Sequence, residues 1–267
     1  VKGSKGAEMI PQAILACAVL FSVAVCGAPF VLRLAPQARW LTRMCLSFSM
    51  GFALIMLAEV LCAFLGISPL LLEGAVALLG IALFLRDRKR ILCIGEIIKG
   101  SSGDVVEAKR LDGADRLALG MAALYLFLCI LYFDRIIIWM GGDSLAHAEI
   151  IRMLMDGRPV PVGIPPFGSY WEYYPKGFHL FTLPWALAFG LLDALRTIPI
   201  LITAVVPLLI YCMLREMGRK EEAVYAAALG EFVFSAHYSH LIWAGYPTAT
   251  AEMLLAAAML AAVARPG

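Results

Sequence analysis

Residues 139–196 read WMGGDSLAHAEIIRMLMDGRPVPVGIPPFGSYWEYYPKGFHLFTLPWALAFGLLDALR and form the longest interval in which charged, aromatic and proline residues gather outside the apolar runs. On both sides of it the chain has the composition of membrane-spanning helices. Within a bilayer, irregular polar backbone is tolerated only where protein or a water-filled cavity covers it. The interval therefore predicts a bundle of spanning helices whose function lies in this loop and at the mouths of its neighbours.

The overall composition is that of a polytopic membrane protein. Apolar residues make up 62% of the chain and the mean hydropathy is +0.84, well above the roughly 45–50% apolar usage of soluble domains. The net charge of +2 is small, and the basic residues form short clusters between apolar runs, which argues against a nucleic-acid partner. The seven cysteines lie almost all inside apolar runs and predict neither a disulfide framework nor a zinc site.

The apolar runs predict an all-α bundle of about seven spans. These runs are Met9–Leu34, Met44–Gly66, Pro69–Leu85, Leu117–Trp139, Thr197–Leu214, Ala223–Ala236 and Thr248–Val263. We divide the chain into an N-terminal segment, residues 1–116, with three helices and a basic cytoplasmic loop, and a core, residues 117–267, that contains the outer loop 140–196. Because the chain stops a few residues after the last run, we expect a further C-terminal part to be missing.

Basic clusters set the expected orientation, since Lys and Arg are enriched in cytoplasmic loops. The run Gly177–Leu192 decides on which side of the membrane the later residues lie. It has only 16 residues and contains Pro184, whereas roughly 20 residues are needed to cross a bilayer. If this run lies in the membrane plane or re-enters on the outer side, the cluster Arg215–Lys220 returns to the cytoplasm. We therefore expect a multi-pass plasma-membrane protein whose loop 140–196 faces outward.

Asp143 and His147 are the candidate catalytic residues. Asp143 follows two glycines and precedes the amphipathic segment Leu145–Asp156, which Gly157 closes. Asp143 is either the cap of this helix or a carboxylate at the outer membrane surface, and its position alone does not decide between the two. His147 lies four residues later on the same helical face, within reach of a shared proton or ligand. The pair leaves room for a divalent cation, Mg²⁺ or Mn²⁺, although two ligands make an incomplete set.

Three further charged residues of the same helix predict a solvated face. Glu149, Arg152 and Asp156 recur at helical spacing, apart from the apolar residues of the helix. Such a pattern is most simply an ion-paired surface, with a catalytic role as the alternative.

A rigid aromatic segment and three basic residues form the candidate substrate site. Glu172 and Tyr174 lie in the run YWEYYP, where aromatic rings serve either as interfacial anchors or as a lining for sugar faces, with Glu172 bonding hydroxyl groups. Lys176 and His179 open the next helix, where free backbone N–H groups favour an anion. Arg196 adds a second positive charge ahead of the following span. A lipid phosphate is the anion expected at this depth.

Four pieces of the core carry a family resemblance: GGDSLAHAEIIRMLMDG, YYPKGFHLFTLPWALAFG, LLDALRTIPILITAVVPLLIYCMLREMGRKEEAVYAAALG and SHLIWAGYPTATAEMLLAAAMLAA. In this order they resemble the GT-C superfamily of membrane glycosyltransferases, which use polyprenyl-phosphate-linked sugars and include protein O-mannosyltransferases, aminoarabinose transferases and oligosaccharyltransferases. The resemblance implies a GT-C-like fold, with Asp143 as the catalytic carboxylate and Arg196 near the lipid phosphate. It departs from the family at Ser144, where many relatives have a second acid, and in the three spans before Leu117.

Transfer of a sugar from a polyprenyl-phosphate donor to an acceptor at the outer face is the leading hypothesis. The alternative is a membrane transporter or lipid-binding protein without chemistry, in which Glu59 and Glu73, within the second and third runs, carry ions. A membrane metallohydrolase using His147, His237 and His240 is the third reading. Its spacing departs from the two histidines at i and i+4 and the helical glutamate of zinc proteases.

Overall fold

The computed structural model describes residues 5–67, 111–133, 142–158, 176–233, 240–242 and 244–265, with scattered positions between 71 and 86. Most of these residues are helical and none is in a strand, as the composition predicts. The helices are α1 (Lys5–Leu34), α2 (Trp40–Leu65), α6 (Gly113–Phe133), α7 (Gly142–Met155), α9 (Gly177–Phe189), α10 (Leu191–Glu216), α11 (Lys220–Phe232) and α13 (Tyr246–Val263).

Five helices of the described part are long and apolar enough to cross a membrane. They are α1, α2, α6, α10 and α13. Large apolar side chains remain exposed along them, as on Leu117, Leu124 and Leu128 of α6, which is the expected surface of a helix in contact with lipid tails. The multi-pass helical architecture is therefore confirmed at this level.

The total of about seven spans stays a prediction. The third predicted span, Pro69–Leu85, lies largely outside the described residues. The sixth, Ala223–Ala236, corresponds to α11, of which 13 residues are described. The short run Gly177–Leu192 forms α9, whose 13 residues are fewer than a crossing needs.

One end of the bundle collects the basic clusters and is called the basic end here, after Arg39, Arg215 and their acidic partners Asp112 and Asp115. Arg39 Nη2 donates to Asp115 Oδ2 at 2.8 Å and Arg215 Nη2 donates to Asp112 Oδ2 at 2.6 Å. Burial alone raises the pKa of Asp112, but hydrogen bonds from Arg215 and from the Asp115 backbone lower it well below its usual range. The starts of α2 and α6 and the end of α10 thus share one end, as expected if α9 does not cross.

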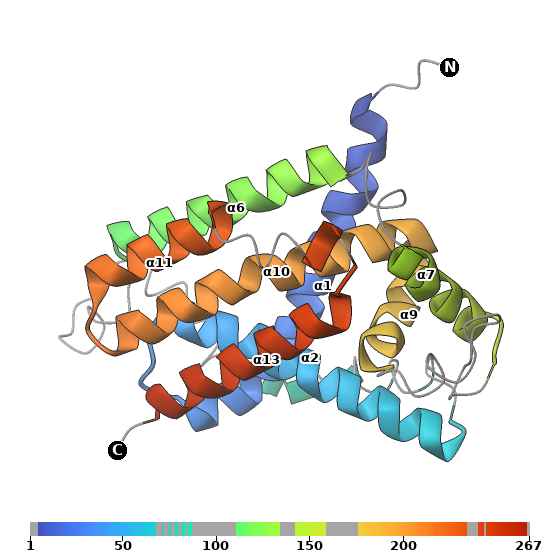
Figure 1. Cartoon of the computed structure of the whole chain (residues 1–267). Helices are drawn as coiled ribbons and strands as arrows, with labels where there is room; N and C mark the ends of the chain where they lie inside the picture. The colour runs from blue at the N-terminus through green and yellow to red at the C-terminus, as the bar shows by residue number, and fades with distance from the viewer. Residues whose placement is uncertain are drawn as a thin grey trace.

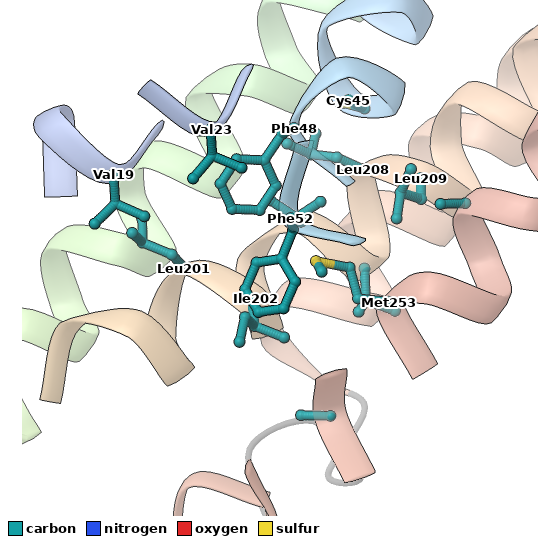
Figure 2. Close-up of a cluster of buried hydrophobic side chains, with 14 of the residues drawn as sticks. Val19, Val23, Cys45, Phe48, Phe52, Leu201, Ile202, Leu208, Leu209 and Met253 are labelled. Atoms are coloured by element: carbon teal, nitrogen blue, oxygen red, sulfur yellow. The ribbon is translucent and has the colours of Figure 1, made fainter. Parts of the chain in front are cut away.

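Helix α10 runs through the middle of the molecule, with α6 and α11 on one side of it and α2 and α13 on the other (Figure 1). Its side chains are buried along most of its length. Figure 2 shows Phe52 of α2 directed toward Ile202 of α10, with Met253 of α13 beside them. The Phe52 ring also stacks on Phe181 of α9, with ring centroids 3.8 Å apart, so α9 is tied to the same core.

The α1–α2 hairpin is the tightest helix pair described. A Cβ atom added at Gly51 would lie 1.8 Å from the carbonyl oxygen of Val23, and one at Gly27 would lie 1.9 Å from that of Ser47. Glycine is required at both positions because the two backbones are in contact there. Small residues at a helix crossing are the usual means of association in lipid, where apolar burial between helices gives little driving force.

The opposite end of the bundle carries α7 and α9 and the starts of α10 and α13, and is called the site end below (Figure 1). Gly157 closes α7 with a φ of 77°, and the N–H of Arg158 donates to the Met153 carbonyl at 3.1 Å. The predicted helix end at Gly157 is therefore confirmed, and its backbone is left-handed. At Gly177, the first residue of α9, an added Cβ would lie 2.7 Å from the sulfur of Met56, so α9 packs closely on α2.

Candidate functional site

Helix α7 presents two different faces. Its apolar face packs Ala146 and Ile150 against Leu180 of α9. Its outer face carries Arg152, whose Nη2 lies 2.6 Å from Glu149 Oε1, so the predicted ion-paired surface is confirmed. Helix α7 thus lies against α9 through one side and exposes the other.

The structure separates the two candidate catalytic residues by exposure. Helix α7 begins at Gly142, so Asp143 lies in its first turn and is exposed. One turn later His147 has none of its surface exposed. Ser144, between them, is also buried. Residues 144, 146 and 147 of α7 are covered, whereas Asp143 and Leu145 are exposed, so a position four residues from Asp143 on the same helix differs strongly from it in exposure.

His147 is held by partners from two other elements. Its Nδ1 lies 2.8 Å from Nε2 of His179 on α9, and its Nε2 lies 2.9 Å from the carbonyl oxygen of Ala244. A carbonyl only accepts, so Nε2 of His147 carries the hydrogen. In neutral His147, Nδ1 is then the acceptor, and Nε2–H of His179 donates to it. The chain of donors therefore runs from His179 through His147 to Ala244.

The surroundings of His147 favour its neutral form. Burial lowers its pKa to about 4; the hydrogen bond to Ala244 opposes this shift and the positive charge of Lys176 adds to it. Lys176 is the N-terminal cap residue of α9 and only 8% of its surface is exposed. At neutral pH His147 is therefore a fixed donor to Ala244 and an acceptor for His179.

Ala244 has an unusual backbone conformation. Its φ is 63°, the single positive value at a non-glycine residue within the described ranges. The left-handed region costs an alanine roughly 1–2 kcal/mol. The hydrogen bond from His147 holds this carbonyl, and Tyr246 follows two residues later as the first residue of α13. Backbone strain of this kind collects at functional sites because the surrounding structure must impose it.

A pocket opens beside this cluster, between α7, α10 and α13. Its volume is about 40 Å³, and it is lined by Ser144, Leu145, Ala148, Leu192, Leu195, Arg196 and Tyr246. The first turn of α7 therefore borders it, with backbone N–H groups that a helix leaves without internal partners. Arg196 is the charged residue of the lining, and the rest is apolar or carries a hydroxyl. A guanidinium beside a helix N-terminus is an arrangement that can bind an anion.

Tyr246 joins the two parts of the site end. Its ring centroid lies 5.2 Å from that of His147 and its side chain also lines the pocket. The predicted residues accordingly fall into two groups. His147 and His179 form a buried hydrogen-bonded pair near Lys176. Arg196 lines the pocket together with Ser144, the neighbour of Asp143. Glu172 and Tyr174 lie outside the described residues.

Tyr246 and Ala244 are the residues that sequence reasoning missed. Tyr246 stands directly before Pro247, at the first turn of α13, and proline at that position is a recognised sign of a helix start. That sign places Tyr246 at the start of the last helix. Nothing in the sequence predicts the conformation of Ala244 or its bond to His147, 97 residues away.

The described residues include no group of three or more His, Cys, Asp or Glu side chains placed to hold a metal. His240 instead lies 2.9 Å from Glu252, through its Nε2 and Oε1 atoms, while His147 faces His179. His237 falls outside the described part of the chain. The residues in view therefore do not fit the metallohydrolase hypothesis or an Mg²⁺ or Mn²⁺ site built on Asp143 and His147.

Comparison of the chain with protein-family models, curated proteins and solved structures gave no match.

Proposed function

We propose that this protein transfers a sugar from a polyprenyl-phosphate donor to an acceptor hydroxyl at the outer face of the plasma membrane. One observation carries the proposal: Arg196 and the first turn of α7 share a largely apolar pocket, lined also by leucines, at the site end of a membrane bundle. A guanidinium and free helix N–H groups bind a phosphate, and apolar walls suit the prenyl chain that follows it. The order of motifs that resembles GT-C enzymes supports the same donor.

The proposed reaction needs two groups from the protein, a base for the acceptor hydroxyl and a positive charge near the leaving phosphate. The acceptor hydroxyl attacks the anomeric carbon, the bond between that carbon and the phosphate oxygen breaks, and polyprenyl phosphate leaves with the electron pair. Asp143, exposed next to Ser144 of the pocket, takes the proton of the acceptor. Arg196 stabilises the charge that develops on the departing phosphate.

In this proposal His147 and His179 position the site. Their hydrogen bonds join α7, α9 and Ala244, which sets Tyr246 at the pocket wall. Because His147 is buried and kept neutral, it serves as a fixed contact, and the exposed Asp143 serves as the base.

The orientation follows from charge. Lys and Arg collect on the cytoplasmic side of membrane proteins, so the basic end with Arg39 and Arg215 is assigned to the cytoplasm. The site end and residues 140–196 then face outward. Lipid-linked donors displayed at the outer leaflet would reach the pocket from the bilayer.

A transfer assay with two matched acidic variants tests the proposal. Purified protein in vesicles is given a panel of polyprenyl-phosphate hexoses and pentoses with extracted outer-surface acceptors, and released polyprenyl phosphate is measured. We expect Asp143→Asn to slow release about 10²–10⁴-fold, as loss of a general base does. Asp156→Asn, directly after the other end of the same helix and also exposed, should leave the rate unchanged. Equal rates for Asp143→Asn and wild type would remove Asp143 from the reaction.

A further inference from the structure

A second polar group lies away from the site end, in the interface of α6, α10 and α11. These three helices contact one another. Helix α11 turns one narrow stripe inward, Ala223, Ala227 and Glu231, at intervals of four residues. Two members of the stripe are the smallest side chain after glycine, and the third is a carboxylic acid. Glu231 is only 5% exposed.

The carboxyl group of Glu231 has no hydrogen-bond partner for either oxygen within the described residues. A buried carboxylate without a partner costs several kcal/mol, far more than the neutral acid does. The fold therefore tolerates this side chain most easily as COOH. A charged form would need water or a cation to enter the interface.

The neighbours of Glu231 offer oxygen atoms without charge. Tyr125 of α6 donates its hydroxyl to Thr203 Oγ1 of α10 at 3.2 Å. Pro207, one turn after Thr203, has no N–H to give to the Thr203 carbonyl. Helices α10 and α11 approach closely at this proline, since a Cβ added at Gly230 would lie 2.8 Å from Pro207 Cβ. Glu231 follows Gly230, so the acid lies near the part of α10 in which the hydrogen bond to the Thr203 carbonyl is missing.

No described charge opposes or compensates the acid. The titratable groups that α6 turns toward it are Tyr125 and Cys129, a phenol and a thiol that are neutral at pH 7. The stretch of α10 from Pro199 to Pro207 contains no charged residue. His240, on the neighbouring segment 240–242, is bonded to Glu252.

We propose that Glu231 is a proton-binding site within the α6–α10–α11 interface, occupied by a proton at neutral pH and exchanging it with water. The site is independent of the proposed sugar transfer, because it uses α6, α11 and a later stretch of α10 and shares none of the pocket residues. Loss of the proton would place an unpaired charge between α11 and its two partners, so the proton state and the packing of α11 are linked.

Infrared spectroscopy of the protein in lipid vesicles tests this directly, because the C=O stretch of a protonated carboxyl is resolved from that of a carboxylate. We expect a COOH band at pH 7 that Glu231→Gln removes. Glu222→Gln is the control: Glu222 is exposed on the same helix and paired with Arg219 at 2.9 Å, so its variant should keep the band. The Glu231 band should fade as the pH is raised.

Labelling with an apolar carbodiimide gives a second readout, since the reagent adds to a protonated acid in an apolar setting without loss of atoms. Mass spectrometry of peptides should place the adduct on Glu231 and not on Glu222. A wild-type COOH band that survives Glu231→Gln unchanged, or equal labelling of the two residues in folded protein, would overturn the proposal. Either outcome leaves the proposal for Asp143 and Arg196 untouched.

Discussion

Replacement of Gly51 by alanine tests how the α1–α2 hairpin is held together. The new Cβ would lie 1.8 Å from the carbonyl oxygen of Val23 and 3.0 Å from the backbone nitrogen of Gly27. Carbon and oxygen atoms in contact normally stay about 3.3–3.6 Å apart. Both obstructing atoms are backbone, so no side-chain rotation relieves the overlap. The helices would have to separate at their crossing.

The expected cost follows from that separation. Overpacking in a well-packed interior costs about 1–3 kcal/mol and occasionally more, and a backbone obstacle places Gly51→Ala at the upper part of this range. Gly120→Ala in α6 is the matched control, since no atom lies within 4 Å of its added Cβ. Alanine exceeds glycine in helix propensity by up to about 1 kcal/mol, so this variant should be neutral or more stable.

Unfolding in mixed micelles with increasing SDS, followed by circular dichroism, measures both variants against wild type. We expect Gly51→Ala to unfold at a lower SDS fraction and Gly120→Ala to unfold at the same fraction or a higher one. If the two variants behave alike, the close approach of α1 and α2 is not what holds the hairpin.

Three further predictions concern the buried polar groups and the strained residue. The pKa of His147 is about 4 in the folded protein and ~6.5 in the unfolded chain, so the unfolded chain binds more protons between these two pH values. The free energy of unfolding should therefore be at its full value above pH ~6.5 and fall by up to about 3 kcal/mol toward pH 4. Calorimetry should show a shallower fall for His147→Gln. Asp115→Asn weakens the buried hydrogen bonds that Asp115 accepts from Arg39 and Tyr211, so it should lower the free energy of unfolding by about 2–4 kcal/mol, measured by SDS unfolding. Glu222→Gln, on the exposed surface, should show no measurable change. Ala244→Gly relieves roughly 1–2 kcal/mol of backbone strain at the positive φ but adds about 0.4–1 kcal/mol of unfolded-chain entropy, so its free energy of unfolding should be unchanged or higher by up to about 1 kcal/mol. Ala251→Gly, on the exposed side of α13, has no strain to relieve and should lower the free energy of unfolding by up to about 1 kcal/mol. If Ala244→Gly lowers stability as much as Ala251→Gly does, the conformation of Ala244 is not strained.

Helix positions followed from composition and periodicity because long apolar runs leave the backbone few alternatives in a bilayer. The predicted span Thr197–Leu214 is helix α10, and it extends further at both ends, to Leu191 and Glu216. The added residues are good helix formers, and Arg196 and Arg215 at its ends are tolerated there because they reach the pocket and the acidic residues of the basic end. A prediction from hydropathy alone ends the helix at such charged residues.

The candidate site could be predicted only in part. Periodicity places Asp143 and His147 on one face of a helix, but it cannot show that α9 and Ala244 cover His147 and leave Asp143 open. The contacts of His147 lie 32 and 97 residues away in the chain. Such pairings depend on how the helices dock, and a single sequence carries no local signal for them. The same holds for Glu231, whose neighbours come from α6 and α10.

The central claim is that the pocket at the site end binds the phosphate of a polyprenyl lipid through Arg196. Native mass spectrometry of gently purified protein tests it most directly, comparing wild type with Arg196→Gln and with Arg152→Gln, a variant at an exposed arginine of α7 paired with Glu149. We predict that polyprenyl phosphate or its sugar ester stays bound to wild type and to Arg152→Gln and is lost from Arg196→Gln. Folded wild-type protein without such a lipid, or equal retention by all three proteins, would contradict the account.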